Sequence, residues 1–244
     1  MQRLITFEGV SNFRDLGGYD TEDGGRLRWS RLYRSSNLSG MTETDQQLFE
    51  ALGIRTVIDL RSVDEQALRP NRIRSPLVRT EAMTIPPQVP THVAAALSDD
   101  ETGAAACRGL LTDIYRSYAR NYARVIGNFL QTVSAAGGQP VLFHCSAGKD
   151  RTGVMSAMLL LALDVPLGTV RTDYLLSRDH FRPFPSTYPK MVQAVLDGVE
   201  DGYLTAFLEE VGYFRMPRDA LFADVFGLRD GDRRALKNLL VEDG

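Results

Sequence analysis

The sequence contains few of the residues that build disulfide frameworks or metal centres. It has two cysteines, Cys107 and Cys145, in 244 residues. Two cysteines are too few for a disulfide framework in a chain of this length, so at least one is better explained as a working thiol. The three histidines are not spaced as zinc ligands are, and we expect neither a metal nor another cofactor.

Long apolar segments are also lacking. The most apolar run, roughly residues 154–163, is about half as long as a membrane-spanning helix. The N-terminal residues MQRLITFEGVSNFRD have no apolar core of the kind that signal peptides carry. We therefore expect a cytoplasmic protein with no integral membrane segment, although export without a visible signal stays open.

A strong excess of one charge is absent as well. The formal net charge is −3, so we expect no general attraction to nucleic acid or to an anionic membrane. Hydrophobic residues make up 43% of the chain, which is ordinary for a globular protein and argues against global disorder. We expect a single folded domain over residues 1–244, and the oligomeric state is not predicted.

The periodicity of apolar residues predicts an α/β fold. Residues 42–53 have the pattern of a helix, with Thr42 and Asp45 as an N-terminal capping pair and Gly53 at the end. The apolar runs 54–62 and 140–144 predict buried strands. A helix joined to a strand by a short link favours a central mixed, largely parallel sheet flanked by helices.

Two further parts of the chain complete this expected architecture. Residues 64–115 include a long arginine- and proline-rich stretch, which we interpret as a helical cover or lid inserted into the domain. Helical spacing returns at about residue 110 and continues to 133. The C-terminal half is predicted to be helical, with helices at 152–166 and near 190–198, 203–211 and 217–240.

The stretch HCSAGKDRTG, residues 144–153, joins a predicted strand to a predicted helix. The strand brings Cys145 to the carboxyl edge of the sheet, where ligands of open α/β sheets bind. The small residues Ser146, Ala147 and Gly148 allow backbone N–H groups to point inward together. Such a nest, followed by a helix N-terminus, binds a tetrahedral anion and favours an ionised thiol at Cys145.

Arg151 adds a planar guanidinium, whose paired N–H groups match two oxygens of a phosphate. Lys149 adds a second positive charge to the same loop. A thiolate, an amide nest and a guanidinium together can attack phosphorus and form a covalent phospho-cysteine. The leaving oxygen then needs a proton from a nearby acid, for which Asp150 and Asp59 are candidates.

This loop resembles the HC-x5-R-[ST] signature of the cysteine-based protein tyrosine phosphatase superfamily. The residues that follow Cys145 in this loop are similar to those of bacterial atypical members that accept phosphotyrosine, phosphoserine or phosphothreonine, and phosphoinositides. The segments NFRDLGGY, LYRSSNLSGMTETD, LGIRTVIDLRS and DYLLS are similar to the same subgroup in order and spacing. The resemblance covers nearly the whole chain and is weakest through residues 68–110.

The resemblance implies a phosphoric monoester hydrolase of the dual- or triple-specificity type. Its substrates would be phosphoproteins or phosphoinositides, and inorganic phosphate would bind in the loop. Cys145 matches the nucleophile, Arg151 the phosphate-binding arginine, and Thr152 the hydroxyl that hydrogen-bonds the thiolate. His144 matches a neighbour that orders the loop, and Lys149 would contact the extra phosphates of an inositol ring.

The acid is not settled by the sequence. The subgroup with an aspartate in the signature loop uses that residue, so we favour Asp150 and keep Asp59 as a supporting or alternative acid. Asp59 could equally be a strand-end residue that pairs with Arg61. Asn12, Arg14 and Asp15 of the NFRDLGG motif are better explained as structural hydrogen-bonding residues.

Other functions stay open at this point. A sulfurtransferase or an arsenate reductase also uses an activated cysteine in an anion loop. The former usually lacks a Lys-Asp-Arg-Thr ending, and the latter needs a resolving thiol, whereas Cys107 is better explained as an inert buried thiol. A non-catalytic phosphate-binding module would usually have lost Cys145 or Arg151. The tyrosines Tyr115, Tyr118 and Tyr122 are better explained by core or cover packing than by stacking on bases.

Overall fold

A five-stranded sheet forms the centre of the molecule in the computed structural model, which describes residues 2–86, 93, 96–183 and 187–244. Its strand order is β1-β3-β6-β4-β5. The strands are β1 (Arg14–Asp15), β3 (Leu32–Ser35), β4 (Thr56–Asp59), β5 (Arg79–Ala82) and β6 (Val141–His144). All neighbouring pairs are parallel except β1 with β3, so the predicted mixed, largely parallel sheet is confirmed.

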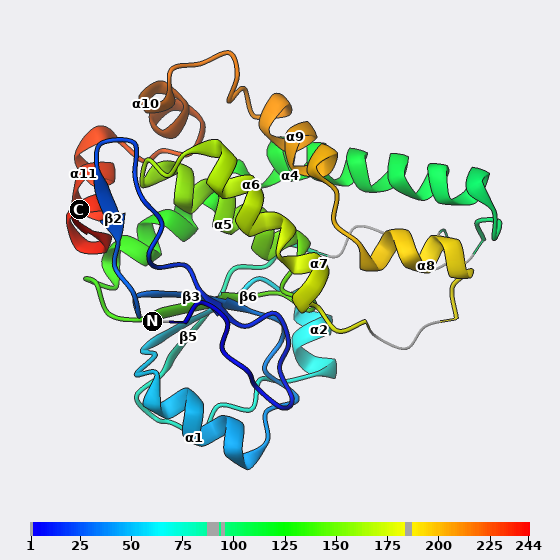
Figure 1. Cartoon of the computed structure of the whole chain (residues 1–244), viewed down its shortest axis with the longest axis horizontal. Helices are drawn as coiled ribbons and strands as arrows, with labels where there is room; N and C mark the ends of the chain where they lie inside the picture. Colours follow the sequence, from blue (N-terminus) through cyan, green and yellow to red (C-terminus); the bar gives the residue numbers. More distant parts are fainter. Residues whose placement is uncertain (1, 87–92, 94–95, 184–186) are drawn as a thin grey trace.

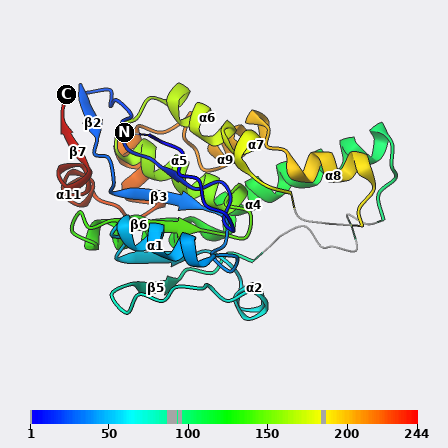
Figure 2. The same ribbon diagram turned by 60° about the horizontal axis from the view of Figure 1, so that its bottom comes forward.

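Helices cover both faces of this sheet (Figure 1). One face carries α1 (Glu43–Ala51) and the short α2 (Val63–Leu68). The other carries α4 (Glu101–Ala135), α5 (Asp150–Ala162), α6 (Leu167–Leu175) and α9 (Asp201–Glu210). Figure 2 shows the same separation after rotation, with α1 in front of the sheet and α5 behind it. The arrangement is a three-layer α/β sandwich.

Alternation along the strands explains this layering. Val57 and Leu142 point to the smaller cluster under α1, which includes Phe49, whereas Ile58 and Phe143 point to the large cluster around α4 and α5. Successive side chains of a strand point to opposite faces, so a strand that is buried on both sides is a continuous apolar run. This is why both central strands were predictable from the sequence.

The register of the parallel strands sets the position of the site. Ser35, Asp59 and His144 lie side by side at the ends of β3, β4 and β6. The chain leaves all three strands at this carboxyl edge, and the segment after β6 is the HCSAGKDRTG loop. The expected location of the loop at the carboxyl edge of the sheet is therefore confirmed.

Local capping signals also behave as predicted in α1. Thr42 accepts a hydrogen bond from the Asp45 backbone, and the Asp45 side chain accepts one from the Thr42 backbone. Gly53 follows the helix with φ +65°, a left-handed conformation that glycine adopts without strain.

Several boundaries differ from the sequence-based expectation. The long helix α4 begins at Glu101 rather than near residue 110, with Asp100 as its N-cap. The segment 64–115 that we expected to be a helical cover contains the strand β5, which extends the central sheet, and its residues 87–92 and 94–95 lie outside the described residues. The interval 217–240 is not one helix but three elements, α10 (Arg218–Ala220), a π-helical turn η1 (Leu221–Val225) and α11 (Asp230–Leu240).

The remaining elements close the two ends of the domain. The strand β2 (Gly25–Leu27) pairs with the C-terminal strand β7 (Val241–Asp243). The helices α7 (Ser177–His180) and α8 (Lys190–Asp197) follow α6, and α8 lies along the first turns of α4 (Figures 1 and 2). None of the helices in the described ranges is long and apolar enough to cross a membrane.

Candidate active site

Cys145 follows directly after β6 and lies at the bottom of a small pocket. Its exposed fraction is only 2%, and Cys145 is one of the residues that line this pocket. The pocket has a volume of about 170 Å³. It is lined by the loop and by the helices α4 and α8: Leu111, Ile114, Tyr115, Tyr118, Cys145, Ser146, Ala147, Asp150, Arg151 and Leu196.

Two loop carbonyls accept hydrogen bonds from residues that do not line this pocket. The Ser146 carbonyl accepts from the backbone N–H and from Nδ2 of Asn37. The Gly148 carbonyl accepts from Asn12 Nδ2 and from an Arg34 Nη2, both at 2.8 Å. Because carbonyls bound on the outside leave the neighbouring N–H groups on the inside, the loop has the form of an anion-binding nest.

Gly148 is required for this loop shape. Its φ is +67°, and a Cβ added there would lie 2.2 Å from the carbonyl oxygen of Ser35. No residue with a side chain fits without moving β3 or the loop. The helix α5 then begins at Asp150, and within the described residues its N-cap Lys149 makes no side-chain capping hydrogen bond, so the first N–H groups of the helix stay available to a ligand.

Arg151 is held end-on by a glutamate from α2. Its Nη1 and Nη2 donate to Glu65 Oε2 and Oε1 at 2.7 and 2.8 Å, and Nη1 also donates to the Ile85 carbonyl. Burial tends to raise the pKa of Glu65, but the hydrogen bonds and charge of Arg151 outweigh it and lower this pKa to about 2. Ser146 Oγ also donates to Glu65, so a carboxylate from α2 links the arginine to the loop.

This pairing leaves one edge of the guanidinium unoccupied. A guanidinium has five N–H groups, of which three are used by Glu65 and Ile85. Among the described residues, nothing accepts from Nε or from the second Nη2 hydrogen of Arg151. Because Arg151 lines the pocket beside Cys145, this Nε–Nη2 edge is a two-pronged donor suited to a phosphate.

Thr152 follows on the first turn of α5 and is fully buried. Its Oγ1 has no hydrogen-bond partner in the described parts of the chain. A buried hydroxyl without a partner is costly to folding unless a ligand or another conformation supplies one. The hydrogen bond to the Cys145 sulfur that the sequence implies for Thr152 is not made in this conformation.

Asp150 lies on the wall of the pocket and is bound on one oxygen. Its Oδ1 accepts a hydrogen bond from Tyr115 of α4 at 2.8 Å, and its Oδ2 is 3.8 Å from Lys149 Nζ. Lys149 itself does not line the pocket. Its ammonium donates to the Leu196 carbonyl and lies 5.4 Å from the ring centroid of Phe181.

Asp59 lies behind the loop and does not line the pocket. It is buried and pairs with Arg61 at 2.6 Å, and Asn71 also donates to it. Burial tends to raise the pKa of Asp59, but the hydrogen bond and the positive charge of Arg61 lower it overall. Of the two candidate acids, the structure brings only Asp150 to the pocket with Cys145 and Arg151.

His144 is fully buried between the strand ends. Its Nδ1 is 3.0 Å from the Cys145 carbonyl, and its Nε2 is 3.0 Å from Asn71 Nδ2 and 3.7 Å from Asp59 Oδ2. Burial lowers the pKa of His144, so the imidazole is neutral. A neutral ring with both nitrogens engaged positions the backbone at Cys145.

A buried ionic network supports the loop from the opposite side. Asp173 of α6 pairs with Arg14 at 3.0 Å and with Arg34 at 2.9 Å, and both guanidiniums have no exposed surface. Arg34 in turn donates to the Gly148 carbonyl, and Arg14 donates to Asn12. The NFRDLGG and DYLLS segments thus meet behind the loop. The structural role predicted for Asn12 and Arg14 is confirmed, and Asp15 accepts from the backbone of Gly17 and Ser30.

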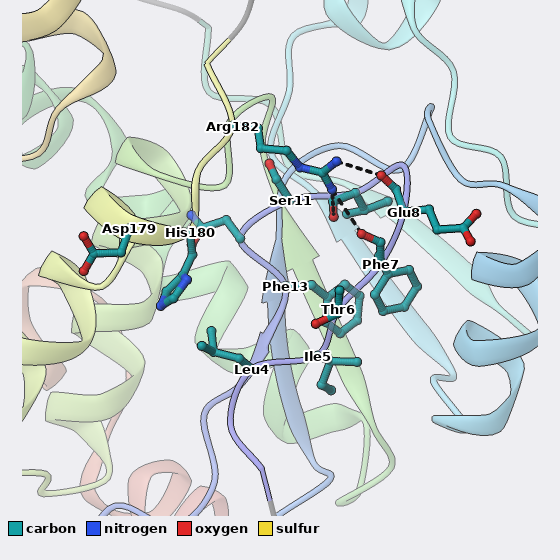
Figure 3. A pocket seen from close by; sticks show the side chains of 12 residues that line it. Leu4, Ile5, Thr6, Phe7, Glu8, Ser11, Phe13, Asp179, His180 and Arg182 are labelled. Atoms are coloured by element: carbon teal, nitrogen blue, oxygen red, sulfur yellow. Dashed lines mark hydrogen bonds between the residues drawn. The ribbon is translucent and has the colours of Figure 1, made fainter.

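A second hollow of about 380 Å³ lies between the N-terminal segment and the end of α7 (Figure 3). Arg182 donates there to the carbonyls of Phe7, Glu8 and Val10. Figure 3 shows the guanidinium turned toward these backbone groups. The hollow contains no residue of the Cys145 loop, and Arg182 serves to tie the segment after α7 to the N-terminal segment.

The described residues contain no group of three or more His, Cys, Asp or Glu side chains that could hold a metal ion. Cys107 is a free, fully buried thiol of α4 inside the large apolar cluster, and burial raises its pKa. Burial and the raised pKa both disfavour the thiolate form of Cys107.

Two groups at the site were not found from the sequence. Glu65 is the N3 residue of a capping box with Ser62, a signal that marks a helix start but carries no information about Arg151. Tyr115 was assigned to packing, and its ring is indeed buried, but its hydroxyl binds Asp150.

Comparisons with known proteins match nearly the whole chain to one family. A family model described as the tyrosine phosphatase family matches residues 5–242. A Cupriavidus necator protein that is named as a tyrosine-protein phosphatase is 30% identical over 247 residues, covering 92% of this chain and 86% of that protein. The triple specificity protein phosphatase PtpB of Mycobacterium tuberculosis is 32% identical over 210 residues, covering 78% of this chain and 74% of PtpB.

Among solved structures, P. aeruginosa TpbA is 20% identical, with a TM-score of 0.32, over 75% of this chain and 90% of TpbA.

Proposed function

The chain belongs to the tyrosine phosphatase family and is an enzyme of that type, and from this premise we propose that it hydrolyses phosphoric monoesters through a phospho-cysteine at Cys145. The family match favours this reaction over the sulfurtransferase and arsenate reductase alternatives.

In the first step the Cys145 sulfur attacks the phosphorus of the bound ester. The S–P bond forms as the P–O bond to the leaving group breaks, and Asp150 gives its proton to the leaving oxygen. The inward N–H groups of residues 146–149 and the free edge of Arg151 hold the phosphoryl oxygens during the transfer. Thr152 Oγ1, which has no partner among the described residues, is then available to the sulfur as it becomes the leaving group.

In the second step water attacks the phosphorus of the phospho-cysteine. Asp150, now a carboxylate, accepts a proton from the water, the S–P bond breaks, and inorganic phosphate leaves the regenerated thiolate. Asp59 supports this cycle from behind the loop through His144 and Arg61 and is kept as the alternative acid.

The observation that carries the proposal is that the Arg151 guanidinium is bound by protein groups on one side only. Glu65 and Ile85 occupy three N–H groups, and the unoccupied Nε–Nη2 edge belongs to a side chain that lines the same pocket as Cys145. Most buried polar groups are hydrogen-bonded, so an open guanidinium edge at the pocket favours a ligand that accepts from it. A fork held rigidly with one edge open is suited to a tetrahedral anion.

The substrate class is also a proposal. PtpB, the M. tuberculosis relative, is named a triple specificity protein phosphatase. We propose that this chain acts on phosphotyrosine and also on phosphoserine or phosphothreonine and on phosphoinositides. Phosphotyrosine suits a pocket walled by Tyr118, Ile114 and Leu196. For an inositol ring, Lys149 would have to turn from the Leu196 carbonyl toward the pocket.

The test is turnover of an aryl phosphate in the presence of a metal chelator. We expect Cys145→Ser and Arg151→Ala to lose activity at least about a thousandfold, as removal of a nucleophile does. Cys107→Ser is the matched thiol control and should keep full activity. Full activity of Cys145→Ser would refute the proposal.

The acid is assigned with leaving groups of different quality. Asp150→Asn should slow an ester with a poor leaving group, such as phenyl phosphate, much more than one with a good leaving group, such as p-nitrophenyl phosphate. Asp59→Asn should slow both equally if it only supports the loop. The reverse pattern would assign the acid to Asp59. A panel of phosphotyrosine peptide, phosphoserine peptide and phosphoinositide then measures the substrate range.

A further inference from the structure

A chain of phenol hydroxyls continues from Asp150 into the core of the protein. Tyr115 Oη donates to Asp150 Oδ1 at 2.8 Å, and Tyr115 Oη lies 2.7 Å from Tyr174 Oη. Since the Tyr115 hydrogen is used on the carboxylate, Tyr174 is the donor to Tyr115. Three side chains from α4, α5 and α6 are thereby joined in one line that ends at the pocket.

We propose that Tyr115 and Tyr174 are positioning residues that fix Asp150 for proton transfer in the phosphatase reaction. The proposal rests on the function proposed above, in which Asp150 is the acid. With Oδ1 held by Tyr115, the other oxygen, Oδ2, is left to carry the proton to the leaving group. The chain thus selects one oxygen and one orientation of the carboxyl group.

The two tyrosines stay donors across the working pH range. Burial raises the pKa of both well above the ordinary value, and the negative charge of Asp150 adds to this effect. Neither ring has appreciable exposed surface. A buried phenol in such a chain is costly unless its hydroxyl is bound, so the hydrogen bonds have a fixed direction.

Two features of the structure fix the position of Tyr174. A Cβ at Gly153, the last residue of HCSAGKDRTG, would lie 2.9 Å from the Tyr174 ring, so glycine makes room for that ring. Asp173, the residue before Tyr174, is locked between Arg14 and Arg34. The glycine that ends the loop and the DYLLS segment therefore act together to bring Tyr174 to Tyr115.

Other ionisable groups also face Asp150, and any pH effect must be measured against them. They are Lys149 on its own element, Tyr118 and Tyr115 on α4, Tyr174 on α6 and Tyr203 on α9. Tyr203 offers a matched control. The centroids of the Tyr203 and Tyr115 rings are 5.6 Å apart, and the buried Tyr203 hydroxyl has no partner in the described ranges.

The experiment compares Tyr115→Phe, Tyr174→Phe and Tyr203→Phe, each of which removes one hydroxyl and keeps the ring. For phenyl phosphate we expect kcat to fall about tenfold in Tyr115→Phe and severalfold in Tyr174→Phe, since a hydrogen bond to a charged group is lost. For p-nitrophenyl phosphate the loss should be under threefold. Because the ionised carboxylate loses a donor, the alkaline limb of the pH–rate profile should move to higher pH in Tyr115→Phe. Tyr203→Phe should match the wild type throughout.

Three outcomes would overturn the positioning role. They are Tyr115→Phe behaving like Tyr203→Phe, an equal loss on both esters, or an alkaline limb that does not move. Melting temperatures of the variants separate a general loss of folding from a loss at Asp150. The proposed function fails separately, if Asp150→Asn itself shows no dependence on the leaving group. If Asp150→Asn shows that dependence and Tyr115→Phe does not, the positioning role alone is wrong.

Discussion

The buried pair of arginines behind the loop gives a sharp prediction about Asp173. This carboxylate is 1% exposed and is the shared partner of Arg14 and Arg34, whose side chains have no exposed surface. In Asp173→Asn the shape is kept, but two buried guanidiniums lose their counter-charge. Removing one partner of a buried ion pair costs about 3–5 kcal/mol.

A loss of this size is large compared with the total stability of a domain, which is typically about 5–15 kcal/mol. For a chain of this length it lowers the melting temperature by roughly 6–10 °C. Activity should fall as well, because Arg34 also donates to the Gly148 carbonyl that shapes the loop. The assays are urea unfolding and aryl phosphate turnover, with Asp20→Asn as the control, since Asp20 forms an exposed pair with Arg26. A loss below about 1 kcal/mol in Asp173→Asn would refute the reasoning.

The same residue predicts how stability depends on acid. Burial tends to raise the pKa of Asp173, but Arg14 and Arg34 outweigh it and lower the pKa from 3.8 to about 2. A lowered pKa in the folded state stabilises the protein above the unfolded value, so this contribution is complete above about pH 4 and is lost as the pH falls toward 2. The difference is roughly 2 kcal/mol. Asp173→Asn should therefore show a flatter loss of stability between pH 4 and pH 2, and an unchanged slope would contradict the assignment.

Two further substitutions test the loop and its arginine. Gly148→Ala should lower kcat/KM at least about a hundredfold, because the added Cβ would lie 2.2 Å from the Ser35 carbonyl oxygen. The variant should still melt cooperatively. Activity within threefold of the wild type would show that the loop adapts to the added methyl group. Glu65→Gln should lower kcat about tenfold, because Arg151 loses the carboxylate that orients it. Inhibition by inorganic phosphate should not weaken, because the charge of Arg151 is no longer neutralised. An unchanged kcat would show that Glu65 does not position Arg151.

The central part of the fold was predictable because its signals are local. The strands β4 and β6 are buried on both faces and so are continuous apolar runs, and α1 has its cap residues in sequence. The strand β5 was missed because Arg79, Thr80, Glu81 and Ala82 are mostly exposed at the edge of the sheet. Only its pairing with β4 makes it a strand, and pairing between distant segments is not visible in the residues themselves.

The start of α4 was placed too late for a related reason. Its first turns are rich in alanine and glycine, which give little apolar periodicity, although Ala104 and Cys107 are buried there. Tertiary packing against α8 and α9 supplies what the local pattern lacks.

The candidate site likewise has one part that the local sequence predicts and another part that depends on distant contacts. Cys145, the loop glycine and Arg151 are within one short segment, so their chemistry could be derived from spacing. The partner of Arg151 is 86 residues away, and the partner of Asp150 is 35 residues away on another helix. These contacts depend on how α2 and α4 pack at the carboxyl edge of the sheet, and no local pattern encodes that.

The most direct test of the account is to look for phosphate on Cys145 during turnover. The enzyme would be quenched in acid while it hydrolyses an aryl phosphate, and the peptide that contains Cys145 would be analysed by mass spectrometry. We predict that this peptide carries one phosphoryl group on the sulfur and that Cys145→Ser forms no such adduct. Sustained hydrolysis with Cys145 unmodified, or with the phosphoryl group on another residue, would contradict the account.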